Sequence, residues 1–234
     1  MQSAQVDDLS RLRIVMIGAT GAVGSEVVRA LQRDGALDQL SLLGRSAFKG
    51  SLDERIVQHQ VDVLSPASYA GLLESHDCAI CTLGVGQPSK MSKAEFTRID
   101  RDAVIDFAMA CKAAGVRHFQ LLSSVGADPG SRSFFLRSKG ELQERLKALD
   151  FERLSLFQPS MILTDKNRYG VLQAMTLIVW PLLGPFMIGP LRRFRGIHVS
   201  QLGQAFAKDV RTQRTGVDTY QWPQITSLAG RSFE

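Results

Sequence analysis

The sequence predicts an α/β fold with a doubly wound parallel sheet. Short apolar runs alternate with segments of helical spacing from Leu12 to Phe157, and each pair of parallel strands needs a crossover such as a helix. The first apolar run ends directly in a glycine-rich turn. The 234 residues, 44% of them hydrophobic, suffice for one domain with a complete core. We therefore expect a single domain over residues 1–234, with residues 1–11 as a flexible N-terminal segment.

Each expected element follows from its local pattern. Branched apolar runs predict buried strands, and spacing at three and four residues predicts helices. Gly35 and Gly115 are expected helix stops, while Ser65-Pro66 is expected to open a helix with a serine cap and proline in the first turn. The predicted strands are residues 12–17, 40–43, 55–63, 78–83, 118–122 and 154–157. The predicted helices are residues 22–34, one from residue 65, 89–114 and 134–149.

After Ser160 this alternation stops, and residues 160–234 are expected to form a small C-terminal helical region that contacts a substrate or partner. The stretch from Val171 to Ile188 carries no charge, and three arginines follow by Arg195. Pro181, Gly184 and Pro185 argue against a spanning helix. Three alternatives stay open for Val171 to Arg195: a helix over the substrate side of the sheet, a homodimer face, or a peripheral contact with anionic lipid.

The glycine turn predicts a dinucleotide site, because it lies between a strand and a helix. Gly18 permits a tight turn, Gly21 lets the backbone approach a pyrophosphate, and Gly24 lets the helix pack closely on the strand. The N–H groups at the start of the helix favour phosphate. Together with these three glycines, the turn contributes Thr20, Ala22 and Val23.

The end of the second strand favours NADP over NAD. An NAD site commonly has an acid there, whereas this strand ends in Gly44-Arg45-Ser46 and no acid follows before Asp53. Arg45 and Ser46 are expected to bind the 2′-phosphate, although Arg45 is also compatible with an ordinary surface arginine. Asp62 is predicted either to accept from the adenine amino group or to cap the next helix. Further predicted members of the cofactor site are Val63, Leu83 and Gly84.

Four motifs resemble those of the atypical short-chain dehydrogenase/reductases, most nearly the HIV Tat-interacting protein 2 group and its bacterial relatives. They are the turn Gly18–Gly24, Leu43-Gly44-Arg45, the run from Leu121 to Asp128, and Lys139-Gly140-Glu141. The resemblance covers residues 12–215 and implies a Rossmann fold, NADP(H) binding and a Ser/Tyr/Lys catalytic arrangement.

Carried onto this chain, the resemblance implies Ser124, or its neighbour Ser123, as the serine and Lys139 as the lysine. The tyrosine position is occupied by Phe135, which has no hydroxyl to exchange a proton with a substrate. Lys139 is expected to keep its ribose contact, with Ser123 and Pro159 also at the cofactor. A second departure is Gln158-Pro159-Ser160, where the family often has Arg-Pro-Gly.

Two functions remain open at this point. One is an NADP-dependent oxidoreductase acting on a small carbonyl or quinone, with Ser124, Lys139 and a water or another hydroxyl as proton donor. The nearest downstream phenol is Tyr169, more simply a surface residue. The other is a redox-silent NADPH-binding regulatory, scaffold or assembly protein, either free or associated with a membrane.

Other classes of site lack the patterns they need. The net charge of +5 suits an anionic ligand, but no zinc-finger, RNP or helix-turn-helix pattern indicates nucleic acid. The four histidines show no metal-ligand spacing, so no metal site is expected. Cys78 and Cys81 lie in a predicted buried strand and are expected to be structural rather than redox-active. Three cysteines without framework spacing, and a polar N-terminus unlike a signal peptide, predict a cytoplasmic protein, either free or peripheral at a membrane.

Overall fold

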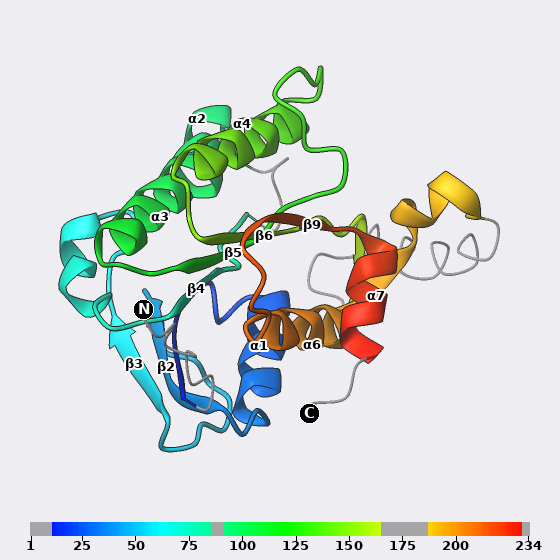
Figure 1. The fold of residues 1–234 in the computed structure, drawn as a ribbon. Coiled ribbons are helices and arrows are strands. Elements are labelled where there is room, and N and C mark those ends of the chain that lie inside the picture. The colour runs from blue at the N-terminus through cyan, green and yellow to red at the C-terminus, as the bar shows by residue number, and fades with distance from the viewer. Residues whose placement is uncertain (1–10, 86–90, 165–186, 231–234) are drawn as a thin grey trace, which may run out of the picture.

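The computed structural model describes residues 11–85, 91–164 and 187–230, and Figure 1 shows their arrangement. A seven-stranded sheet, parallel throughout, has the order β3-β2-β1-β4-β5-β6-β9. The order reverses between β1 and β4, the position at which doubly wound sheets bind ligands. The predicted doubly wound α/β fold is confirmed. The strands of this sheet are β1 Leu12–Ile17, β2 Leu37–Gly44, β3 Ile56–Gln60, β4 Cys78–Cys81, β5 His118–Leu122, β6 Arg153–Phe157 and β9 Gly216–Tyr220.

Helices cover both faces of the sheet (Figure 1). One layer holds α1 Ala22–Gln32, α6 Val199–Asp209 and α7 Trp222–Gly230. The opposite layer holds α2 Lys93–Thr97, α3 Ala103–Ala113 and α4 Phe134–Ala148. The 3₁₀ turns are η1 Pro66–Ser68, η2 Ala70–Leu72 and η6 Gly189–Phe194, and η4 Arg98–Asp102 is a π-helical turn. A separate two-stranded parallel ladder pairs β7 Met161–Leu163 with β8 Gly196–His198.

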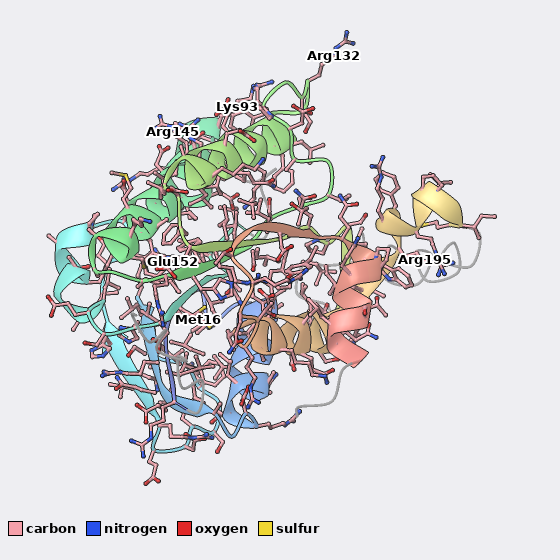
Figure 2. All side chains as sticks on the ribbon, in the orientation of Figure 1. Met16, Lys93, Arg132, Arg145, Glu152 and Arg195 are labelled. Atoms are coloured by element: carbon pink, nitrogen blue, oxygen red, sulfur yellow. The ribbon has the colours of Figure 1, made fainter. Side chains whose placement is uncertain are left out.

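Two apolar cores lie on the two faces of the sheet, and the central strands alternate between them. In β1, Ile14 and Met16 pack toward the layer of α1 and α6, whereas Val15 and Ile17 pack toward the layer of α3 and α4. Figure 2 places Met16 in the interior among the side chains of these layers. Cys78 and Cys81 also fall in opposite cores, and burial raises the pKa of the Cys81 thiol to about 12. The prediction that these cysteines lie in a buried strand is confirmed.

The prediction of a helix from Ser65 is wrong. The chain forms two single 3₁₀ turns there, and the Ser65 side chain caps neither of them. Instead the Asp62 carboxylate accepts from the N–H of Leu64 at 3.0 Å. Gly71 and the short span between β3 and β4 leave too few good helix formers for a stable helix.

The helix expected over residues 89–114 is shorter and interrupted. Ser92 and Glu95 form a capping box, so the helix begins at Lys93. The π-helical turn η4 divides α2 from α3, and Gly115, at a φ of 85°, follows the end of α3 as predicted. The capping box is visible in the sequence and fixes the start better than the apolar spacing does. Residue 89 lies outside the described ranges.

The C-terminal region is integrated into the fold and is not a helical addition alone. β9 extends the main sheet beside β6, and α6 packs on α1 so closely that a Cβ on Gly203 would lie 2.7 Å from Glu26. The five residues of β9 are mainly exposed and include no apolar run, so no sequence pattern predicts this strand. The uncharged stretch lies largely in residues 165–186, outside the described ranges. Within those ranges, no helix is long and apolar enough to cross a membrane.

Candidate functional site

The glycine turn joins β1 to α1 in the geometry that a phosphate site needs. Gly18 has a φ of 87°, and a Cβ on it would lie 2.5 Å from the backbone of Leu83. A Cβ on Gly24 would lie 2.1 Å from the Gly18 carbonyl oxygen, so only glycine lets α1 pack this closely. Gly21 is different, because its Cβ would meet only the Gly18 carbonyl at 3.3 Å. Gly21 therefore leaves its outer side free for a ligand.

The start of α1 has no competing anion of its own. Gly21 is the N-cap and supplies no side-chain hydrogen bond, and the first turn carries no acidic residue. The first N–H groups of the helix, with the positive end of its dipole, therefore suit a bound phosphate.

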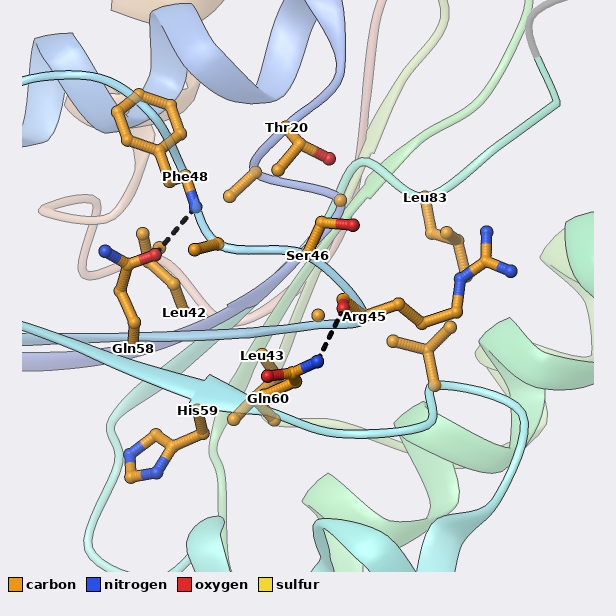
Figure 3. A pocket seen from close by; sticks show the side chains of 15 residues that line it. Thr20, Leu42, Leu43, Arg45, Ser46, Phe48, Gln58, His59, Gln60 and Leu83 are labelled. Carbon is orange, nitrogen blue, oxygen red and sulfur yellow. Dashed lines mark hydrogen bonds between the residues drawn. The ribbon is translucent and has the colours of Figure 1, made fainter.

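A cavity of about 320 Å³ opens beside this turn, at the carboxyl ends of β1, β2 and β3 (Figure 3). In this view Arg45 extends toward Leu83, and Ser46 lies between Arg45 and Thr20. Six of the lining residues are predicted members of the cofactor site: Gly18, Thr20, Arg45, Ser46, Val63 and Leu83. The lining residues that the sequence patterns did not predict are Ala19, Leu42, Leu43, Gly44, Ala47, Phe48, Gln58, His59 and Gln60.

Two glutamines of β3 shape the loop that carries Arg45. The Gln58 side chain accepts from the N–H of Phe48 at 2.7 Å. Gln60 donates to the carbonyl oxygen of Arg45 at 3.3 Å. The alternation of these glutamines along β3 was visible in the sequence, but the pairing of β3 with β2 that brings them to the loop was not. None of the described residues that line the cavity is an acid, so within this part of the chain Arg45 has no carboxylate competitor there.

Nine other predicted cofactor residues do not line this cavity: Gly21, Ala22, Val23, Gly24, Asp62, Gly84, Ser123, Lys139 and Pro159. Asp62 is exposed, and its carboxylate accepts from the Leu64 N–H, which precedes η1, so it caps no helix; its adenine contact stays a prediction. Val23 is buried in the core, and Ala22 packs against it at the start of α1. Gly84 lies under the Asp100 carboxylate, where a Cβ would be 3.1 Å from Oδ1. The Pro159 carbonyl accepts from Val125 at 3.1 Å.

Three side chains follow one another at single-turn spacing on α4, namely Phe135, Lys139 and Gln143. The Phe135 ring packs 5.8 Å from that of Phe96, centroid to centroid. The Lys139 ammonium lies 2.6 Å from Oδ2 of Asp100, and both side chains are buried. The other carboxylate oxygen of Asp100 accepts from the N–H of Val85 at 2.8 Å. Lys139 is thus held by a charged partner that no sequence pattern indicated.

Ser123 and Ser124 have different surroundings at the end of β5. Ser123 is buried, and its hydroxyl accepts from Gln143 at 2.6 Å. Gln158, where the family often has arginine, continues this contact by donating to Gln143 at 3.0 Å. Ser124 is half-buried, and its hydroxyl has only a 3.4 Å contact with the carbonyl of Val125. Ser124 is therefore the serine whose hydroxyl is available to a ligand.

Gly140 explains why the motif beside Lys139 contains glycine. A Cβ at Gly140 would lie 2.2 Å from the backbone of Asp128 and Pro129. The close approach packs α4 against the loop that begins at Ser124. The two sequence motifs, from Leu121 to Asp128 and at Lys139, are therefore in direct contact.

Comparison with known proteins identifies the family. A family model described as NAD(P)H-binding matches residues 18–153, which run from the glycine turn into β6. The chain belongs to this NAD(P)H-binding family. It is an NAD(P)-binding protein of the short-chain dehydrogenase/reductase type, as the motifs predicted.

Curated relatives agree with this assignment. Protein HTATIP2 of Rattus norvegicus is 34% identical over 156 residues, which cover 66% of this chain and 64% of the relative. Protein FMP52, mitochondrial, of Meyerozyma guilliermondii is 29% identical over 158 residues, 67% of each chain. The chain thus matches about two thirds of the length of these relatives. The predicted resemblance to the HIV Tat-interacting protein 2 group is confirmed.

Solved structures share the fold at low identity. A UDP-N-acetylglucosamine 4-epimerase from Methanobrevibacter ruminantium has a TM-score of 0.67 at 14% identity, covering 90% of this chain and 76% of that one. The Bordetella bronchiseptica enzyme WbmH, in complex with NAD⁺, has a TM-score of 0.66 at 14% identity, covering 90% and 75%. Among the residues that the structure describes, no cluster of histidine, cysteine and acidic side chains suits a metal ion.

Proposed function

We propose that this protein binds NADPH in preference to NADH and acts through that binding, as a regulatory, scaffold or assembly protein. The observation that carries this proposal is the environment of Lys139. The residue one turn before Lys139 is Phe135, whose ring packs on Phe96. The ammonium of Lys139 is paired with the buried carboxylate of Asp100. Among the described residues, the site therefore offers a lysine that would bind the ribose and no phenol beside it that would exchange the proton.

The other tyrosines of the described chain do not replace the missing phenol. Tyr69 is buried against the ring of Phe107 under α3. Tyr220 is buried on the opposite face, and its hydroxyl donates to Asp209 at 2.8 Å. Burial raises the pKa of both phenols well above the usual value. Tyr169 lies outside the described residues.

The preference for NADPH rests on the lining of the cavity. Arg45 and Ser46 stand exposed at the end of β2, and no acid lines the cavity to accept from a ribose 2′-hydroxyl. A guanidinium and a hydroxyl suit a 2′-phosphate through charge-assisted hydrogen bonds. The glycine turn and the start of α1 would hold the pyrophosphate, and Lys139 and Ser124 would bind the nicotinamide half. When bound, NADPH supplies a hydride at its nicotinamide ring.

Turnover measurements test the redox-silent part of the proposal. Wild-type protein saturated with NADPH is mixed with a panel of small carbonyls and quinones, and the absorbance of the reduced nicotinamide is followed. We expect no oxidation above that of Lys139→Met, a control that lacks the ammonium. Oxidation by the wild type that Lys139→Met abolishes would overturn the redox-silent assignment.

A second candidate is an NADP-dependent oxidoreductase with a different proton donor. It is favoured by the half-buried Ser124, whose hydroxyl has only one long contact. Ser124 would donate directly or through a water while Lys139 holds the ribose. Turnover that is lost in Ser124→Ala would support it, and turnover lost in Tyr169→Phe would assign the proton to that phenol instead.

For the compartment, we propose the cytoplasm or another reducing environment. All three cysteines are buried free thiols. Burial raises the pKa of each one, so they are unreactive as thiolates.

A further inference from the structure

The segment from Met187 to Arg195 exposes apolar side chains on the outside of the fold. Ile188 is 69% exposed, the highest value among the large hydrophobic residues of the described chain. Leu191 follows at 53%, a value that it shares with Met109. Both belong to, or adjoin, the 3₁₀ helix η6. Figure 1 shows this segment projecting from the side of the molecule near α7, away from the layer of α3 and α4. Isolated exposed residues are ordinary, so the surroundings of these two decide their meaning.

The base of the segment is fixed to the body of the fold. Arg195 donates from Nε to the carbonyl of Met187 at 3.0 Å, which closes the segment into a loop. Its guanidinium lies 4.8 Å from the ring centroid of Trp222 in α7. The Trp222 indole N–H donates to the Gly196 carbonyl at 3.1 Å. Figure 2 shows Arg195 on this projecting part of the chain. The loop thus presents Ile188 and Leu191 from a defined support.

Positive charge surrounds these apolar side chains. Arg192 and Arg193 are exposed beside Leu191, and Arg195 follows them. The sequence has no acidic residue between Asp165 and Asp209. Within the described ranges, the ion pairs that the structure contains do not involve these three arginines. Arg193 lies instead over the ring of Phe194, at 4.9 Å. The segment therefore joins exposed apolar surface to positive charge that has no acidic partner among the described residues.

We propose that the segment from Met187 to Arg195 binds an anionic lipid surface, with Ile188 and Leu191 entering the headgroup region and Arg192 and Arg193 contacting lipid phosphates. A soluble polyanion would use the arginines but gain nothing from the exposed isoleucine and leucine. An anionic bilayer uses both, because apolar burial and basic residues both contribute to interfacial binding. This surface binding does not depend on the dinucleotide, so its test is separate from that of the proposed function.

Vesicle flotation tests the proposal. Full-length protein is mixed with phosphatidylcholine vesicles, with or without phosphatidylglycerol, at low and high salt. We expect binding to the anionic vesicles that weakens with salt. Arg192→Gln/Arg193→Gln should weaken binding by more than about tenfold, since each basic residue near such a surface contributes about fivefold. Ile188→Ser/Leu191→Ser should weaken it comparably, because both side chains leave water on binding.

Matched substitutions elsewhere on the surface serve as controls. Arg132→Gln/Arg145→Gln removes the same charge from the opposite layer, and Met109→Ser removes an equally exposed apolar side chain from α3. Both should bind vesicles within about twofold of wild type. The proposal is overturned if wild type stays unbound on anionic vesicles, or if the control pair weakens binding as much as Arg192→Gln/Arg193→Gln. It is overturned equally if Ile188→Ser/Leu191→Ser binds vesicles as wild type does, which would indicate a general polyanion site.

Discussion

The Lys139 ammonium and the Asp100 carboxylate form a buried ion pair with Nζ 2.6 Å from Oδ2. Asp100 comes from the π-helical turn η4, a type of irregularity often found at functional sites, and Lys139 comes from α4. The same carboxylate holds the Val85 N–H, so it ties the loop after β4 to α4. One acid thereby fixes both the lysine expected at the ribose and the adjoining loop.

Removing that acid should destabilise the fold. Asp100→Asn keeps the size of the side chain but leaves Lys139 as a buried, unpaired charge, a change that costs about 3 kcal/mol or more. Urea unfolding of Asp100→Asn measures the loss. Asp102→Asn is the matched control, because Asp102 is half exposed and pairs with Arg101 at the surface. Its free energy of unfolding should stay within about 1 kcal/mol of wild type. Equal stability of the two variants would contradict the buried pair.

Two glycines of the turn should respond differently to alanine. In Gly24→Ala the new methyl group overlaps the Gly18 carbonyl, so α1 must move and thermal stability should fall by several degrees. In Gly21→Ala the methyl group makes one tight contact, 3.3 Å to the Gly18 carbonyl oxygen, and otherwise enters the space expected for the pyrophosphate. That variant should keep its melting temperature within a few degrees and lose at least about tenfold in NADPH affinity. Calorimetry and nucleotide titration on the same samples decide, and undiminished NADPH binding by Gly21→Ala would rule out the assigned phosphate position.

Restoring a phenol should introduce reductase activity. Phe135→Tyr places a hydroxyl one turn before Lys139, where the family has its proton donor. We expect oxidation of NADPH with at least one carbonyl or quinone, abolished by adding Lys139→Met. Phe134→Tyr is the control, because Phe134 also packs on Phe96 but is not one turn from Lys139. A panel in which Phe135→Tyr and Phe134→Tyr are equally inactive would count against a vestigial reductase site.

Acidification should destabilise the protein through buried His118. Burial lowers the pKa of this imidazole, which contacts Ser155 at 3.0 Å and Asp209 at 3.5 Å, with Arg153 bound to the same aspartate. The unfolded state, with a histidine pKa near about 6.5, takes up the proton first, so stability falls as pH decreases below that value.

Urea unfolding at several pH values measures this dependence. His118→Gln should lose less stability than wild type between about pH 7 and about pH 5, although its stability at neutral pH is lower. Part of the slope should remain, since burial also lowers the pKa of His76. His59→Gln, at a half-exposed position, is the control and should keep the wild-type slope. An unchanged slope in His118→Gln would show that this histidine does not titrate on unfolding.

Local sequence patterns predicted the parts of the fold that depend on neighbouring residues. The apolar runs from β1 to β6 and the glycine turn are of this kind. β9 was not predicted, because an edge strand with few buried residues carries no apolar run. The role of Asp100 was not predicted, because its partner Lys139 is distant in the chain and only the packing of η4 against α4 brings the two side chains together. Gln58 and Gln60 reach the cavity through the register of β3 on β2, which composition and spacing do not encode.

The most direct test of the central claim is a titration of NADPH and NADH into wild type, Arg45→Ala and Arg33→Ala. Arg33 is an exposed arginine outside the cavity and serves as the control. We predict saturable binding to wild type with NADPH preferred, and a loss of about tenfold to 100-fold in NADPH affinity for Arg45→Ala, as expected when a charged hydrogen-bond partner is removed. NADH affinity should change little, and Arg33→Ala should match wild type. Absence of nucleotide binding by wild type, or equal affinity for NADPH in all three proteins, would contradict the account.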